Sequence, residues 1–231
     1  MLFSFFSLFL IYNIFFLKEK SLNFFAEDIY LFIYFLVLTI IFFVFFNSSY
    51  NFSLIFFSLT SSMSNIGISL DSTPSNLWFL FLLIVIIGGS FFSTSSGIRF
   101  LKIYFLFKYS FNEILSYSKP KNVFTNKFHL IDSNVLQKDI NKYFLSVLIF
   151  VISFLVISSL LSIFNVSFED AFKLGILTLM NTVNSSMYNL GNFNFSELNS
   201  YAKVILILFM IIGRVELLTI LIIVKKFLFK S

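Results

Sequence analysis

The sequence has no cysteine, a single histidine and few charged residues, and each shortage excludes a kind of chemistry. Without cysteine the chain has no thiol nucleophile, no disulfide and no cysteine-ligated zinc site, and its redox compartment stays undetermined. The one histidine, His129, lies in a polar, basic segment, where we expect it to be solvated. The apolar runs contain no HExxH motif, no aspartate pair and no Ser/His arrangement. We therefore expect no enzymatic activity.

Charged residues make up 12% of the 231 residues and hydrophobic residues make up 58%. A soluble domain has about twice this share of charge, so the composition is typical of an integral membrane protein. The net charge of +5 could indicate a nucleic-acid partner. The basic residues flank apolar runs, however, which is the pattern that orients membrane helices. We expect membrane lipid around the chain and no nucleic acid.

Four apolar runs are long enough to cross a bilayer, whose hydrocarbon core is spanned by about 20 apolar residues in a helix. They are 29–46, 76–108 with an interruption, 143–164 and 201–224. Residues 1–17 are marginally long enough for a further span. Because no basic residue precedes them and "KEK" follows them, we interpret them as a retained helix and not as a signal peptide.

Lysine and arginine are distributed unevenly between the loops. Residues 47–76 contain none, 99–142 contain eight and 165–203 contain two. The positive-inside rule predicts that 99–142 and the C-terminus are cytoplasmic and that the other two loops lie outside. We therefore expect a multi-pass protein of the cell inner (plasma) membrane.

Two shorter segments lie between the spans, "FSLIFFSLTSSM" (52–63) and "FEDAFKLGILTLM" (168–180). Each is about three helical turns long and leads into small polar residues. Taken singly, either segment could be an interfacial helix in a loop. Together they give a repeat of span, short helix and span that occurs twice, which places a site between the repeats. Two re-entrant helices on the outer side predict a pore whose filter faces outward.

Glycines mark two irregular segments. Gly67, in "SMSNIGISLD" (62–71), could direct consecutive carbonyls inward, and rings of carbonyls replace the hydration shell of a monovalent cation. An ordinary turn is the alternative. The second segment, "IIGGSFFSTSSGIRFLK" (86–102), interrupts a span. Either a packing kink or a loop facing a water-filled cavity fits it, and the serine-rich continuation favours the loop.

These motifs, with "LGNFNFSELNSYAKVILILFMIIGRVELLT" near the C-terminus, resemble the Trk/Ktr-type potassium transporters and their TrkH-like membrane subunit. The resemblance covers the whole chain and implies an all-α membrane fold of span–re-entrant pore helix–span repeats around one potassium pathway. Only two of the family's four repeats are present, the C-terminal half. We therefore expect the end of a preceding helix and a linker in 1–28, the third repeat in 29–110, a cytoplasmic linker in 111–141 and the fourth repeat in 142–231.

The resemblance also implies site residues. The ion filter, which would bind potassium, would consist of Ser64, Asn65, Ile66, Gly67, Ile68, Thr182, Val183, Asn184 and Ser185. The gate beneath it would consist of Gly88, Gly89, Ser93, Thr94, Gly97 and Arg214.

The sequence departs from the family's pattern at several of these places. Asn184 stands where the fourth repeat has its filter glycine. After glycine, asparagine is the residue that best tolerates left-handed dihedrals. Its side chain would still add bulk and a hydrogen-bonding amide to the pore lining, and this would affect the selectivity for potassium. Phe92 and Ser96 stand where glycines are expected, which predicts a stiffer and bulkier gating loop. Arg99 stands where a lysine is usual.

Arg214 and Glu216 are ionisable residues inside the last span, which indicates a functional role. Two residues apart they lie about 200° around a helix, so they cannot face one way as a pair. One arrangement has Arg214 facing the pathway and Glu216 facing a neighbouring helix, and the resemblance implies that Arg214 is a positive barrier below the filter. The alternative is a structural ion pair that holds helices together.

Two filter segments cannot close a four-fold ring. We therefore expect the C-terminal half of a potassium-uptake subunit, completed by a partner half with the first two repeats or by a second copy. The alternative is a non-conducting truncated remnant or an accessory membrane protein of a potassium-uptake complex. The resemblance further implies a dimer, a cytosolic nucleotide-binding gating-ring subunit, K⁺ as the transported ion and no bound cofactor.

Overall fold

The computed structural model describes residues 1–8, 26–46, 51–70, 77–90, 93, 95–118, 137–184, 186–191 and 193–214. Over these residues the secondary structure is helical, apart from one isolated parallel bridge between Ile87 and Ile98. Helices satisfy their backbone hydrogen bonds within one segment, which is what a lipid environment requires. The predicted all-α class is confirmed.

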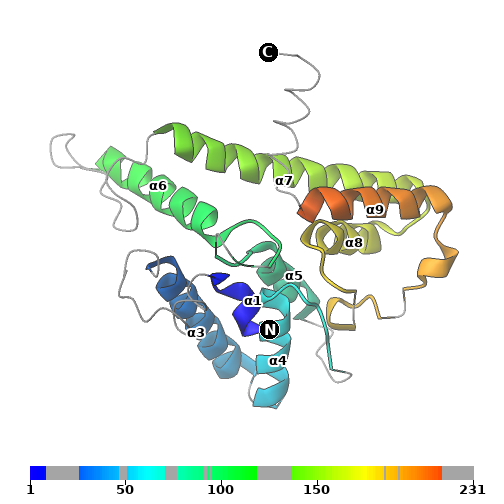
Figure 1. Cartoon of the computed structure of the whole chain (residues 1–231), viewed down its shortest axis with the longest axis horizontal. Coiled ribbons are helices and arrows are strands. Elements are labelled where there is room, and N and C mark those ends of the chain that lie inside the picture. Colours follow the sequence, from blue (N-terminus) through cyan, green and yellow to red (C-terminus); the bar gives the residue numbers. More distant parts are fainter. Residues whose placement is uncertain are drawn as a thin grey trace.

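Two groups of helices follow each other along the chain (Figure 1). The first group contains α3 (Ala26–Phe46), α4 (Phe52–Met63), α5 (Trp78–Ile86) and α6 (Phe100–Ser118). The second contains α7 (Gln137–Ile163), α8 (Phe168–Met180) and α9 (Ser200–Arg214), with the 3-10 turns η4 (Ser186–Tyr188) and η5 (Phe195–Glu197) before α9. A short α1 (Leu2–Phe5) packs beside α4 in the first group.

Helices α3 and α7 are long and apolar enough to cross a membrane, over Glu27–Phe45 and Ile140–Ile163. Only 22% of each of these windows is buried within the chain, whereas the core helix of a soluble protein is mostly buried. The outward apolar side chains therefore suit contact with lipid.

The short helices 52–63 and 168–180 are confirmed as α4 and α8, with the predicted bounds. The span predicted over 76–108 is interrupted, since α5 ends at Ile86 and α6 begins at Phe100. The helix of the third predicted span, α7, begins before the apolar run, at Gln137, because the preceding polar residues continue the helix, and its apolar window covers Ile140–Ile163. Residues 9–17 of the marginal span 1–17 and residues 215–224 of the last predicted span lie outside the described residues.

The two short helices bury their C-terminal parts inside the molecule. Helix α8 packs against α7, α9 and α5, and α4 packs against α3 and α5. Buried hydroxyls of α4 donate to carbonyls of its own preceding turn: Ser58 to Leu54 (2.8 Å), Thr60 to Phe57 (2.9 Å) and Ser62 to Ser58 (2.8 Å). Because these groups are satisfied inside the helix, its polar end can be buried at little cost.

Candidate functional site

Each re-entrant helix leads into an asparagine with a left-handed backbone. Asn65, two residues beyond the end of α4, has a φ of 56°, and Asn181, the C-cap of α8, has a φ of 52°. Asparagine is second only to glycine in tolerating this conformation. The same main-chain bond, to the carbonyl five residues back, follows in both repeats: Ile66 to Ser61 (3.1 Å) and Thr182 to Leu177 (3.0 Å). The chain therefore leaves both helices by the same turn.

The two loops that follow these helices touch through their backbones. The Val183 N–H donates to the Ile66 carbonyl at 3.2 Å. Gly67 has a φ of 76°, and a Cβ there would collide with the Val183 carbonyl oxygen and lie 2.6 Å from the Thr182 Cγ2. Both the dihedral and the space require glycine. The structure thus brings 64–68 and 182–184 together, while Ser185 lies outside the described residues.

Asn184 does not adopt the backbone conformation of Gly67. The described non-glycine residues with positive φ are Asn65, Asn165, Asn181 and Asn189. The left-handed conformation considered for Asn184 therefore occurs at Asn181, where the helix end requires it. Counted from the left-handed asparagines, Gly67 corresponds to Val183. The Asn184 Nδ2 donates to the Leu190 carbonyl at 3.1 Å, and its Oδ1 is buried without a partner among the described residues.

The interruption between α5 and α6, residues 87–99, is a tight loop closed by main-chain hydrogen bonds. Gly88 donates to the Ile98 carbonyl at 2.9 Å, and Ile98 donates to the Ile86 carbonyl at 3.1 Å. Gly97 has a φ of 104°, and a Cβ on it would lie 2.9 Å from the Gly88 Cα. The two glycines therefore let the ends of the loop meet. Phe92 and Thr94 lie outside the described residues.

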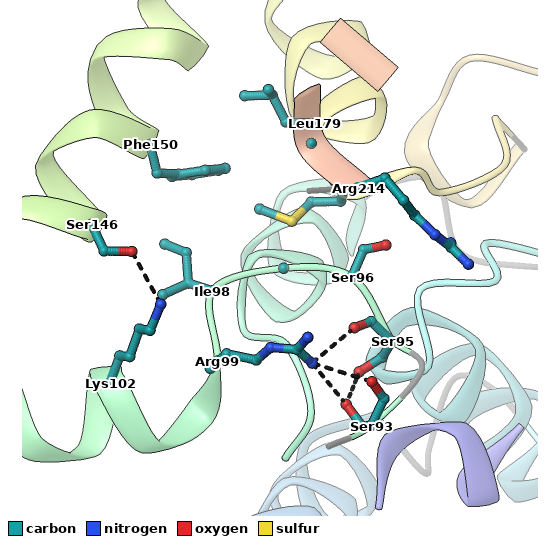
Figure 2. Close-up of a pocket in the computed structure, with 13 residues that line it drawn as sticks. Ser93, Ser95, Ser96, Ile98, Arg99, Lys102, Ser146, Phe150, Leu179 and Arg214 are labelled. Atoms are coloured by element: carbon teal, nitrogen blue, oxygen red, sulfur yellow. Dashed lines mark hydrogen bonds between the residues drawn. The ribbon is translucent and has the colours of Figure 1, made fainter. Parts of the chain in front are cut away.

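Arg99 organises the inside of this loop. Its Nη1 lies within hydrogen-bonding distance of three main-chain carbonyls: Ser90 (3.1 Å), Ser93 (3.3 Å) and Ser95 (3.4 Å). These contacts all come from one nitrogen, whose two N–H groups are shared among the three carbonyls and the Ser93 hydroxyl. Figure 2 shows the bonds from Arg99 to Ser93 and Ser95.

The N-terminal segment supplies further bonds to the loop. The Ser90 and Ser95 N–H groups donate to the carbonyls of Phe5 (3.0 Å) and Ser4 (3.2 Å). Just beyond α1, the Ser7 N–H donates to Asp28 Oδ1 at 3.0 Å, which attaches the segment to the start of α3. These bonds satisfy loop and helix-end groups that would otherwise be buried without partners.

A cavity of about 280 Å³ lies beside the loop (Figure 2). Three basic residues line it, Arg99 from the loop, Lys102 from α6 and Arg214 from α9, together with Ser93, Ser95, Ser96 and Ser146. Lys102 is buried, and its Nζ lies 3.4 Å from the Ser146 Oγ on α7. Arg214 is exposed, and Gly213 before it packs on the backbone of Leu179 at the end of α8.

The structure therefore places Arg214 beside the same cavity as Ser93 and Gly97, two of the loop residues that the resemblance assigns to the gate, whereas Gly88 and Gly89 are not among the residues that line it. Glu216, whose expected direction was toward a neighbouring helix, lies outside the described residues.

Sequence reasoning missed Lys173, which it counted only as a loop charge. Lys173 is 1% exposed in α8, where its Nζ pairs with Glu169 and lies 4.4 Å from the centre of the Trp78 ring on α5. A buried ammonium needs such partners, an anion and the face of an aromatic ring. The spacing of Glu169 and Lys173 could have indicated the ion pair. The contact with Trp78 depends on how α5 packs against α8, which the sequence does not reveal.

Comparisons with known proteins agree with this architecture. None of the curated proteins compared with the chain is significantly similar to it. The crystal structure of the potassium transporter TrkH from Vibrio parahaemolyticus superposes with a TM-score of 0.81 at 23% sequence identity. The superposition covers 95% of this chain and 49% of that one, so the chain spans about half the length of the protein whose fold it shares.

A family model described as "TrkH: Cation transport protein" matches residues 70–230. The match includes the interrupted helix, the second re-entrant helix and the last span. It agrees with the expectation of a membrane protein that is not an enzyme. Because the match covers more than half of the sequence, the chain belongs to the TrkH cation transport protein family.

Proposed function

We propose that the chain is the C-terminal half of a potassium-uptake subunit in the plasma membrane. The observation that carries this proposal is the backbone contact between the two loops at Gly67 and Val183. A polar backbone loop at membrane depth is tolerated only where protein or a water-filled pathway covers it. Two such loops meeting after two buried re-entrant helices are what an ion filter requires.

In this proposal the filter consists of carbonyls from 64–68 and from 182–185. Backbone carbonyls replace the hydration shell of a monovalent cation, and K⁺ is the ion that the family resemblance implies. Asn184 is the unusual member, because its amide nitrogen is engaged by the Leu190 carbonyl while its amide oxygen is buried and unpartnered among the described residues.

The gate would be the loop between α5 and α6, with Gly88, Gly89, Ser93, Thr94 and Gly97, and with Arg214 opposite. The cavity beside this loop and Arg214 supports the assignment, since a cation leaving the filter toward the cytoplasm would pass charged and hydroxyl-bearing side chains there. A guanidinium stays charged at any physiological pH and opposes a passing cation.

The two loops form an open edge and not a ring. Ile68 and Val183 are 48% and 57% exposed at the place where the loops meet. We propose that a partner half with two more repeats, or a second copy of this chain, completes the pore. A dimer of the completed subunit, a cytosolic nucleotide-binding gating ring and a cytoplasmic C-terminus belong to the same proposal.

The test is uptake of Rb⁺, a tracer for K⁺, in a bacterium that lacks its own potassium uptake. We expect no uptake from the chain alone, and uptake when it is expressed with a polypeptide that carries the first two repeats of a TrkH protein. Uptake by the chain alone would favour pairing of two copies. No uptake in the co-expressing cells, although both halves reach the membrane and associate, would favour the alternative of a non-conducting remnant or accessory protein.

A further inference from the structure

The left-handed asparagines that follow α4 and α8 use their side chains in the same way. Asn65 is 6% exposed, and its Nδ2 donates to the carbonyl of Ser96 at 2.6 Å. Asn181 donates from its Nδ2 to the carbonyl of Met210 at 3.1 Å. Each amide thus joins the end of a re-entrant helix to the backbone of the span that follows it in the same repeat.

The acceptors of these two bonds differ in their surroundings. Met210 lies within α9, whose backbone is held by the helix itself. Ser96 lies in the irregular loop between α5 and α6, and no main-chain N–H of a described residue donates to its carbonyl. The Asn65 amide is therefore the hydrogen bond that holds this part of the loop toward the end of α4.

The bond from Asn65 extends a chain of contacts across the site. Val183 in the second loop donates to Ile66 in the first loop, and the neighbouring Asn65 donates to Ser96. Next to Ser96, Gly97 packs on Gly88. The two filter loops and the gating loop are thus joined through consecutive residues, 65 and 66.

We infer that Asn65 is a positioning residue that ties the gating loop to the first filter loop, so that the gating loop moves only when this bond breaks. The roles of filter and gate rest on the proposed function. The hydrogen bond from Asn65 to Ser96, and its effect on how accessible the loop is, can be measured whether or not the proposed function is correct.

The chain has no cysteine, so Ser96→Cys introduces a single thiol that reports on the loop. The Ser96 side chain lines the cavity, and its carbonyl, which accepts the bond, is kept in the variant. The full chain is studied in membranes, where the rate of thiol modification by a small water-soluble reagent is measured. Glycine at position 65 keeps the left-handed backbone without strain and removes only the amide.

We expect Asn65→Gly to raise the modification rate of the thiol introduced at position 96 about five-fold, which corresponds to one net hydrogen bond of about 1 kcal/mol. The matched control is Asn181→Gly, which removes the same side chain from the same helix-end conformation but leaves the loop bond intact. We expect it to change the rate by less than about two-fold. Equal rates in the two variants would overturn the inference, because they would reflect general loosening of helix ends.

A second variant separates the donor from the volume of the side chain. Asn65→Asp keeps the shape and the tolerance for left-handed dihedrals, but it places an acceptor oxygen against the Ser96 carbonyl. Measured at a pH at which this aspartate is ionised and cannot donate, its rate should rise at least as much as that of Asn65→Gly, and an unchanged rate there would overturn the inference. Neither measurement requires transport, so absence of Rb⁺ uptake in the co-expressing cells would contradict the proposed function and leave this result unchanged.

Discussion

Arg99, Lys102 and Arg214 line one cavity, but their surroundings differ. Arg99 faces three carbonyls of the loop between α5 and α6, and the buried Lys102 reaches Ser146 on α7. Arg214 is exposed at the end of the described part of α9. The first two charges are engaged by protein groups that hold the fold together. Arg214 is therefore the charge best suited to act on a passing ion.

Substituting Arg214 with alanine should increase cation flux in the completed pore. At about 4 Å and an effective dielectric constant of about 20, a fixed charge repels a monovalent cation by about 4 kcal/mol. Loop carbonyls offset part of this, which leaves a barrier of about 1–2 kcal/mol. Since about 1.4 kcal/mol corresponds to a factor of ten in rate, we expect Rb⁺ uptake per folded protein to rise about ten-fold.

Arg214→Lys is the control for this prediction, because it keeps the charge and should change the uptake little. A structural ion pair would give the opposite result for Arg214→Ala. In that case the yield of folded protein and the uptake would fall together, and the assignment of Arg214 to the gate would be wrong.

At the scale of elements, α8 and α5 come from different repeats and are joined by the contact between Lys173 and the Trp78 ring. An energetically significant cation–π contact contributes about 1 kcal/mol, and more where water is excluded. We expect Trp78→Leu and Lys173→Met to be less than additive in thermal unfolding. The double-mutant cycle should give a coupling free energy of about 1 kcal/mol. Additive effects would show that the contact between the two side chains contributes no coupling free energy.

The loop charges predict which loops lie outside the cell and which lie in the cytoplasm, and cysteine labelling tests this orientation. A cysteine introduced in place of Ser196, in the loop before α9, should react with a membrane-impermeant reagent in intact cells. A cysteine introduced in place of Lys121, in the segment with eight basic residues, should react only after the cells are opened. The reverse pattern would contradict the orientation and place the loops at Gly67 and Val183 on the cytoplasmic side.

The sequence predicted the elements better than it predicted the contacts between them. Helices α4 and α8 have the predicted bounds because an apolar run and a polar end mark each of them. The start of α7 was missed because polar residues extend a helix beyond the hydrocarbon core without an apolar signal. The glycines of the site were identified correctly as places of irregular backbone, since few other residues allow close approach.

The sequence did not predict which residues the side chains contact, because these contacts depend on how segments that are distant in the chain pack together. Asn65 lies 31 residues from Ser96, and the Lys173 ammonium meets a ring on a helix of the other repeat. The resemblance places Asn184 at the position of the filter glycine of the fourth repeat. The hydrogen bonds at the helix ends instead align Val183 with Gly67.

At the scale of the whole molecule, the chain has the fold of about half of a TrkH protein and leaves its central loops open at one edge. The α9 face that carries Val204, Ile207, Leu208 and Ile211 is also exposed. An apolar face of this kind suits contact with lipid or with the helices of the partner half or second copy that would complete the pore. We propose that the loops at Gly67 and Val183 select the ion in the completed pore.

The most direct test of this claim is the ratio of K⁺ to Na⁺ transport by Gly67→Ser in the completed pore. A serine Cβ would collide with the Val183 carbonyl and oppose the left-handed backbone, so the carbonyls of both loops would shift. The comparison variant is Gly191→Ser, which lies outside both loops, has no left-handed backbone and would bring a Cβ to 3.3 Å from Ser186 just after the second loop. We predict that Gly67→Ser lowers the ratio several-fold and that Gly191→Ser lowers it much less. An unchanged ratio in Gly67→Ser, with the variant folded and conducting, would contradict the claim.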